Sequence, residues 1–404
     1  MYLCFISFVI TFFVCRKYKS DVLNGVILFY IAASICGVIT RHTLYPDAYD
    51  TFFSSIFLCV ILFLCIRPVI EYGKHENYHN VVYLLNNQRF MLLSYSLIVL
   101  QLFSILFFAE EDYAMLARGD LSQIRSEILA AGRGTGSIFR TVAGVASFFY
   151  CYNILLFFYS LSFRNDKKWF LYLLIISSAS RIFHSLTYMG RDGILFWVFS
   201  FVFTFIVFRQ YLKSEAIRLI KRVALIILAF ALLLLIAISI SRFGESDSGV
   251  FLSLIDYFGQ PINNFGMLFD RFHDYRGLKS LFPLLYGETG ATGAEVLSSV
   301  EDFFLKYGIA SNAFYTFVGS FYKAIGPIFT LLIALIYSSY MSKRMQRKYL
   351  NLPKLILLMI IMQIVIHNYF YWAYYIRVAN LYLFTTPIFL AFCRKSSAKL
   401  LITK

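Results

Sequence analysis

Apolar runs of about 15–22 residues recur along almost the whole 404-residue chain. A helix of that length crosses the ~30 Å hydrocarbon core of a bilayer, at a rise of about 1.5 Å per residue. Apolar residues make up 60% of the sequence and aromatic residues 19%, with a mean hydropathy of +0.70. These features exclude an ordinary soluble domain and predict an all-α, polytopic integral membrane protein.

Hydropathy predicts about eleven transmembrane helices (10–12), which form a single transmembrane domain over residues 1–404. The predicted spans are 1–15, 24–40, 51–66, 90–109, 141–163, 169–188, 193–208, 223–241, 322–341, 355–373 and 378–393. Basic residues follow the first run instead of preceding it, so we expect a retained helix and not a signal peptide. Two loops, 110–140 and 242–321, are long enough to carry function.

Basic residues are distributed unevenly between the two sides of these spans. The loops after the first, third, fifth, seventh and ninth spans, together with the C-terminal tail, hold 23 of the 37 lysines and arginines. The positive-inside rule therefore predicts an outer N-terminus, a cytoplasmic C-terminus and periplasmic positions for the two long loops. Because topology accounts for most of the net charge of +15, nucleic acid is not an expected partner.

Outside the predicted cytoplasmic loops, the basic residues are mostly arginine. Arginine supplies 11 of the remaining 14 basic residues, against 10 of the 23 on the cytoplasmic side. Its planar fork of five donors fits phosphate and carboxylate oxygens better than the lysine ammonium does. The bias favours a phosphate-bearing partner at the outer leaflet. The alternative is that these arginines reach lipid headgroups or pair with the outer carboxylates.

Arg181 lies within the sixth predicted span, where an ionised side chain costs about 2.5–3.5 kcal/mol on insertion scales. Helical spacing places Ser177, His184 and Tyr188 on the same face. This face predicts a lined cavity or, alternatively, a hydrogen-bonded cluster that only orders the bundle. The following turn, Gly190-Arg191-Asp192-Gly193, offers an arginine and a helix N-terminus to an anion, or else closes with a surface ion pair.

The tenth predicted span carries a second polar face. Gln363, His367, Tyr371 and Tyr374 share that face by helical spacing, and Arg377 follows. A histidine that titrates near neutral pH could act as general base toward a sugar hydroxyl. The alternative is a buried histidine that only satisfies hydrogen bonds.

Motifs for other chemistries are missing from the sequence. It has no phosphate-binding P-loop, no His-Glu-x-x-His motif and no Gly-x-Ser-x-Gly motif. The seven cysteines (4, 15, 36, 59, 65, 151 and 393) fall within or beside apolar runs, without metal-binding spacing. The outer acidic pairs with metal-site spacing are Glu110-x-Asp112 and Glu245-x-Asp247. We therefore expect no disulfide framework, no metal and no cofactor.

Several short patterns lie between residues 170 and 395. They are Gly190-Arg191 before an aromatic-rich helix, Tyr257-Phe258-Gly259-Gln260-Pro261, Asn264-Phe265-Gly266, Asn312-Ala313-Phe314-Tyr315-Thr316, Phe321-Tyr322 and Gly326. In these patterns the chain resembles the O-antigen and capsule repeat-unit polymerases, the Wzy family. That family is also described by an Arg-x10-Gly pattern, which Arg125…Gly136, Arg133…Gly144 and Arg276…Gly287 fit.

The resemblance implies a bacterial inner-membrane enzyme that joins polyprenyl-pyrophosphate-linked oligosaccharides at the periplasmic face. A nascent chain on its lipid pyrophosphate would be the donor, and a single lipid-linked repeat unit the acceptor. Cations near the departing pyrophosphate would lower the barrier. The candidates for that role are Arg181, Arg191, Arg242, Arg276, Arg133 and Arg377. The candidate bases are His367, Asp192 and His184. Expected partners are the lipid-linked substrates, membrane lipid and a chain-length regulator protein.

Three other functions fit the same features. One is an O-antigen ligase, which would share the arginines and a histidine. Another is a glycosyltransferase that uses a polyprenyl-monophosphate sugar and a metal held by Glu110 and Asp112. The third, from a different class, is a flippase for lipid-linked oligosaccharide. Flippases usually have short loops, whereas this chain places about eighty residues in the 242–321 loop.

Overall fold

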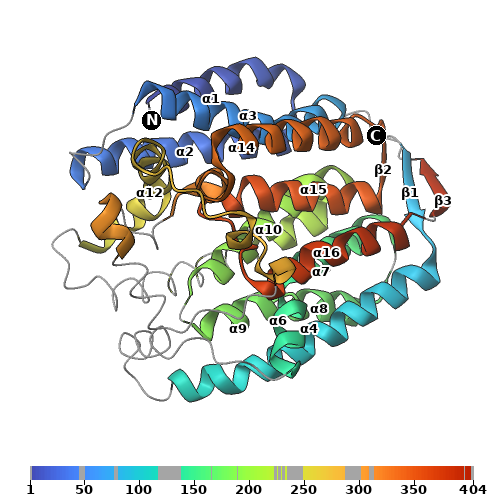
Figure 1. Ribbon diagram of the computed structural model, residues 1–404. Coiled ribbons are helices and arrows are strands. Elements are labelled where there is room, and N and C mark those ends of the chain that lie inside the picture. Colours follow the sequence, from blue (N-terminus) through green and yellow to red (C-terminus); the bar gives the residue numbers. More distant parts are fainter. Residues whose placement is uncertain are drawn as a thin grey trace.

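A computed structural model (Figure 1) describes residues 2–44, 51–76, 81–116, 138–164, 166–188, 190–222, 249–286, 302–308, 314–394 and 396–401, with the single positions 225, 229 and 233. Within these residues, seven helices are long and apolar enough to cross a membrane, or eight if one bent pair counts as a single span. The chain therefore has the helical architecture expected of a multi-pass membrane protein.

The long apolar helices are α2 (Asp21–Thr43), α3 (Phe52–His75), α4 (Asn87–Leu116), the pair α8 (Lys168–Ser177) and α9 (Ser180–Leu186), α10 (Asp192–Phe208), α14 (Thr316–Met345) and α15 (Leu352–Val365) with η6 (His367–Tyr369). The bent pair is α6 (Ile138–Phe148) and α7 (Tyr150–Phe163), whose axes differ by 43°. The shorter elements are α1 (Tyr2–Cys15), α12 (Gly249–Arg271), α16 (Arg377–Phe392), η1 (Arg16–Tyr18), η3 (Arg209–Tyr211), η4 (Leu278–Ser280) and η5 (Pro283–Tyr286).

Ten of the eleven predicted spans coincide with these helices, and the eighth, 223–241, lies mostly outside the described residues. The total of eleven stays a prediction, because α1 has 14 residues and α16 has 16, fewer than a perpendicular crossing needs. One boundary is wrong in a way that matters for the site. The tenth span was predicted to run to residue 373, but α15 ends at Val365 and the chain then becomes irregular.

Part of the predicted 242–321 loop is a helix, α12, that packs along α2 (Figure 1). Gly259 permits the contact, because a Cβ there would lie 2.6 Å from the Cys36 carbonyl oxygen. Asn263 then donates hydrogen bonds to the Gly37 carbonyl at 3.1 Å and to the Thr40 hydroxyl at 3.0 Å. The segment 110–140 is described only in part: α4 continues through its first seven residues, and 117–137 lie outside the described residues.

Three short strands pair in the order β2-β1-β3 and were not predicted. β1 (Val81–Leu85) runs parallel to β2 (Tyr349–Asn351), with Val82 opposite Leu350, and antiparallel to β3 (Ser396–Leu401). The three segments belong to loops and a tail that the charge pattern places on one side of the membrane. Their pairing brings these segments together at one end of the bundle, away from α9 and α12 (Figure 1).

Candidate functional site

The turn between α9 and α10 brings Asp192 to Arg181. Gly193 makes this approach possible, because a Cβ there would lie 2.6 Å from the Arg181 carbonyl oxygen and would also collide with the Ser185 hydroxyl. The first turn of α10 therefore packs directly against α9. Two residues eleven apart in sequence thus meet through a close contact between their two backbones.

Arg181 and Asp192 form a buried ion pair. Their Nη2 and Oδ2 atoms lie 2.8 Å apart, and their side chains are 4% and 8% exposed. Tyr188 and Tyr371 each donate a hydroxyl hydrogen bond to Asp192 Oδ2, at 3.0 and 3.1 Å. The Arg181 guanidinium also lies 4.4 Å from the centre of the Phe148 ring. The turn does not close with a surface ion pair between Arg191 and Asp192, because the Asp192 carboxylate faces Arg181.

His184 belongs to the same cluster, as the helical spacing predicted. Its Nδ1 atom lies 3.3 Å from Arg181 Nη1 and 2.7 Å from the Ser147 hydroxyl. Because a guanidinium can only donate, Nδ1 is assigned as the acceptor, and the ring proton is assigned to Nε2. The imidazole stacks on Phe108 with 4.6 Å between ring centres. This geometry fixes the orientation of the ring.

His367 is also buried, and it lies on the 3-10 turn that follows α15. Its ring stacks on Phe196 at 4.6 Å, and its Nδ1 and Nε2 atoms lie 3.4 Å from the hydroxyls of Tyr150 and Ser200. The helical face predicted for the tenth span does not extend past Val365. Tyr371 reaches Asp192 from the irregular segment that follows, and not from a continuous helix.

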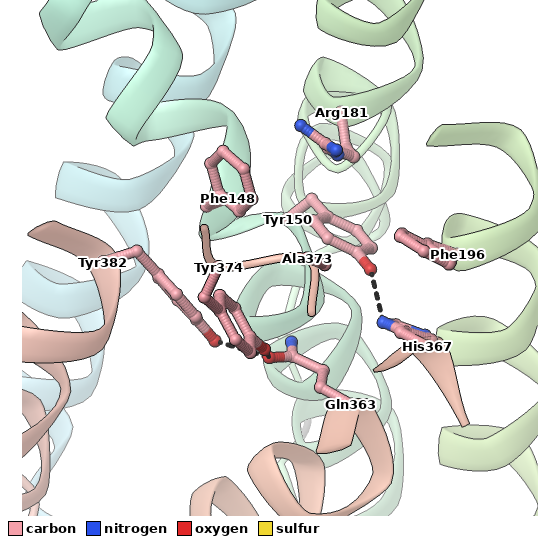
Figure 2. Close-up of a pocket in the computed structure, with 9 residues that line it drawn as sticks. All are labelled: Phe148, Tyr150, Arg181, Phe196, Gln363, His367, Ala373, Tyr374 and Tyr382. Atoms are coloured by element: carbon pink, nitrogen blue, oxygen red, sulfur yellow. Dashed lines mark hydrogen bonds between the residues drawn. The ribbon is translucent and has the colours of Figure 1, made fainter. Parts of the chain in front are cut away.

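Arg181 and His367 line one narrow cavity, which has room for about one water molecule. Figure 2 shows Arg181 toward one end of the cavity and His367 and Gln363 toward the other. Gln363 accepts hydrogen bonds from the hydroxyls of Tyr374 and Tyr382. The full lining is Phe148, Tyr150, Arg181, Phe196, Gln363, His367, Ala373, Tyr374 and Tyr382. Arg181 of the first predicted polar face and Gln363, His367 and Tyr374 of the second thus line one cavity.

Arg191 directly precedes Asp192 in sequence and is also buried. Its guanidinium stacks over the Tyr257 ring of α12 at 4.9 Å. Tyr257 in turn contacts Phe314, with 5.0 Å between ring centres, and Phe314 stacks on Tyr371 at 5.6 Å. Arg191, Tyr257 and Phe314, which belong to three of the short patterns noted in the sequence, therefore lie close together.

The remaining predicted arginines do not join this cluster within the described part of the chain. Arg276 stacks over Phe303 at 4.9 Å, in the segment that follows α12. Arg377 is exposed at the first residue of α16. Arg133 and Arg242 lie outside the described residues. Of the six arginines, Arg181 pairs with Asp192, and Arg191, the residue before Asp192, is buried against Tyr257.

Several side chains around the cluster were not predicted from the sequence. Ser147, Phe148 and Tyr150 come from the bend between α6 and α7, Phe108 from α4, and Tyr257 from α12. Serine and aromatic residues are so common in this chain that nothing in the local pattern distinguishes the first four, whereas Tyr257 belongs to one of the short patterns noted in the sequence. Their role depends on contacts between helices far apart in sequence.

The geometry argues against a metal site at Glu110 and Asp112. Both lie on α4, where residues two apart point to different faces, and Glu110 is exposed while Asp112 is buried. No group of three or more histidine, cysteine or carboxylate side chains among the described residues could hold a metal ion. The second acidic pair, Glu245 and Asp247, lies outside the described residues.

The described fold and cluster define a helical membrane protein with an ionic site enclosed between its helices. Comparison of the chain with protein-family models, with curated proteins and with solved structures finds no match.

Proposed function

We propose that the protein joins oligosaccharide repeat units carried on polyprenyl pyrophosphate, at the periplasmic face of a bacterial inner membrane. One observation carries the proposal. Arg181 forms an ion pair with Asp192, the neighbouring residue Arg191 stacks on Tyr257 of α12, and all three charged residues are buried. A buried arginine beside a carboxylate and two tyrosines, with a second buried arginine on the same turn, suits a substrate that carries both phosphate and hydroxyl groups.

The proposed reaction gives the arginines a physical task. An acceptor sugar hydroxyl attacks the anomeric carbon of the donor, and the bond from that carbon to the pyrophosphate oxygen breaks. The pyrophosphate leaves with the bonding electrons, so negative charge grows on its oxygens during the step. Preorganised cations in a site shielded from water stabilise that charge more than cations in bulk solvent do.

A base must take the proton of the attacking hydroxyl, and the cluster offers three. Asp192 is a carboxylate whose oxygens already accept from Arg181, Tyr188 and Tyr371. His184 keeps Nδ1 as an acceptor, within the same cluster. His367 lies on the cavity wall, where Phe196 and two hydroxyls hold its ring. His184 lies next to Arg181, and it becomes the base when a substrate hydroxyl replaces Ser147 as the partner of Nδ1.

Glycan length is the readout for this function. Arg181→Ala and Arg191→Ala are expected to insert normally but to abolish long surface glycans, leaving single repeats. Arg344→Ala serves as a matched control, because Arg344 also stacks on a tyrosine ring but lies in the last turn of α14. An unchanged ladder of chain lengths in both site variants would contradict the proposed site.

Deletion of the gene separates this function from its alternatives. A surface glycan of one repeat indicates a polymerase, whereas an absence of any surface repeat indicates a flippase. Unattached polymer indicates a ligase. Activity that survives a strong chelator, and survives replacement of both Glu110 and Asp112, would remove the metal-dependent glycosyltransferase.

A further inference from the structure

A second pair of cations lies where the segment after α12 meets the beginning of α14. The Arg276 guanidinium and the Lys323 ammonium each lie 4.9 Å from the centre of the same Phe303 ring. Lys323 also lies 4.8 Å from the centre of the Tyr315 ring. The backbone holds them together, since the Arg276 N–H donates to the Lys323 carbonyl at 2.9 Å.

A break in α14 fixes this arrangement. Gly326 has a φ of +76° inside the helix, directly before Pro327, and this conformation strains any residue other than glycine. A Cβ at Gly326 would lie 2.9 Å from the Tyr275 ring, so the tyrosine occupies the notch that the break creates. The next residue, Arg276, is thereby positioned against Lys323 by backbone and ring contacts.

The charge of this pair is not balanced by an ion pair within the described residues. Two like charges on one ring repel each other, and neither Arg276 nor Lys323 forms a salt bridge with a described carboxylate. Asp274, two residues from Arg276, pairs with Lys306 and accepts from the Tyr307 hydroxyl. Asp302, next to Phe303, is exposed. Two cations that contact one ring, without an ion pair to a described carboxylate, have the charge that attracts an anion.

We propose that Arg276 and Lys323 form a second phosphate-binding site, separate from the Arg181 cluster, for a phosphate carried on a lipid. The sites lie on two sides of one dipeptide: Phe314 stacks on Tyr371 of the first site, while Tyr315 faces Lys323. The identity of the ligand rests on the proposed function, because a reaction between two lipid-linked molecules must accommodate two pyrophosphates. The second site then holds the pyrophosphate of the second substrate.

Titration of inorganic pyrophosphate into the full-length protein in phosphatidylcholine nanodiscs, followed by calorimetry, tests this site. Arg276→Ala and Lys323→Ala should each raise the dissociation constant at least about tenfold, as expected for losing one charge-assisted hydrogen bond. Lys323→Arg keeps the cation and should retain binding within about threefold, which separates loss of charge from loss of folding. Arg344→Ala removes an equal charge from the far end of α14 and should change nothing.

Two outcomes would overturn the second site. One is an equal dissociation constant in the wild type and both alanine variants. The other is loss of the same binding in Arg181→Ala, which would mean that all these cations serve one site. An unchanged glycan ladder in the Arg181 and Arg191 variants refutes the proposed function but leaves this binding result standing.

Competition identifies the source of the phosphate. Displacement of inorganic pyrophosphate by added polyprenyl pyrophosphate, but not by phosphatidylglycerol, supports a lipid-linked substrate as the ligand. Displacement by phosphatidylglycerol supports the phosphate site and assigns it to an anionic membrane headgroup. If neither lipid competes, the claim that the phosphate is carried on a lipid is overturned.

Discussion

Replacing Asp192 with asparagine keeps the shape of the side chain but removes the negative charge that faces Arg181. The asparagine oxygen can still accept from Tyr188 and Tyr371, so the change isolates the charge from the hydrogen bonds. Arg181 is 4% exposed and would keep an uncompensated charge inside the bundle. Breaking such a buried pair from one side costs about 3–5 kcal/mol. We therefore expect Asp192→Asn to lower the free energy of unfolding by that amount.

The exposed pair Arg140–Glu111 supplies a control of similar geometry. Its atoms lie 2.6 Å apart, but its side chains are 41% and 32% exposed. Solvent-exposed pairs contribute about 0–1 kcal/mol, so Glu111→Gln should have a correspondingly small effect. The difference between Asp192→Asn and Glu111→Gln measures the effect of burial, because both changes remove one carboxylate charge.

Unfolding in mixed micelles with added sodium dodecyl sulfate, followed by tryptophan fluorescence, provides the measurement. Trp197 is a suitable reporter because its Nε1 atom donates to Ser178 beside the α8–α9 break. Combining Asp192→Asn with Arg181→Gln should restore about 2–3 kcal/mol relative to the sum of the single changes. A coupling energy below about 0.5 kcal/mol, or equal losses in Asp192→Asn and Glu111→Gln, would refute the reasoning.

Two further predictions concern the backbone and pH. Gly193→Ala should lower the free energy of unfolding and abolish glycan polymerisation, because the added Cβ collides with the Arg181 carbonyl oxygen. Gly25→Ala should change neither in the same assays, because the nearest atom to its added Cβ lies 3.6 Å away. Hydrogen bonds from Lys306 and Tyr307 hold the pKa of Asp274 below its ordinary value of 3.8. The stabilisation that ionised Asp274 contributes to the folded state is present above its ordinary pKa, and it is lost as the pH falls through the lower folded-state pKa. The hydrogen-exchange protection factor over 302–308, which removes the intrinsic pH dependence of exchange, should therefore hold near pH 5 and fall only below about pH 4. A fall in that protection factor near pH 6 would contradict this.

Local sequence patterns predicted much of the helical framework. Ten predicted spans coincide with helices, because hydropathy over about 20 residues is a property of each segment alone. Helical spacing also grouped His184 and Tyr188 with Arg181 correctly, because residues three and seven positions along a helix lie on the same face. The same reasoning extended the tenth helix past Val365, because apolar and aromatic residues continue there without a break.

Tertiary contacts decided the composition of the site. Asp192 faces Arg181 and not Arg191 because Gly193 lets α10 pack directly against α9. Arg276 and Lys323 contact the same Phe303 ring because the neighbouring Tyr275 packs against the helix break at Gly326. No periodicity in the sequence signals either contact.

The sequence by itself determined that this chain is a multi-pass helical protein with an arginine inside an apolar helix. Hydropathy and helical spacing are sums over neighbouring residues, so they can be read without knowing the fold. Only the tertiary structure decided that Asp192 neutralises this arginine. It also decided that Arg276 and Lys323 lie together in a separate place. Charge pairing depends on distances of a few ångströms between separate helices, and close backbone contacts and helix breaks set those distances.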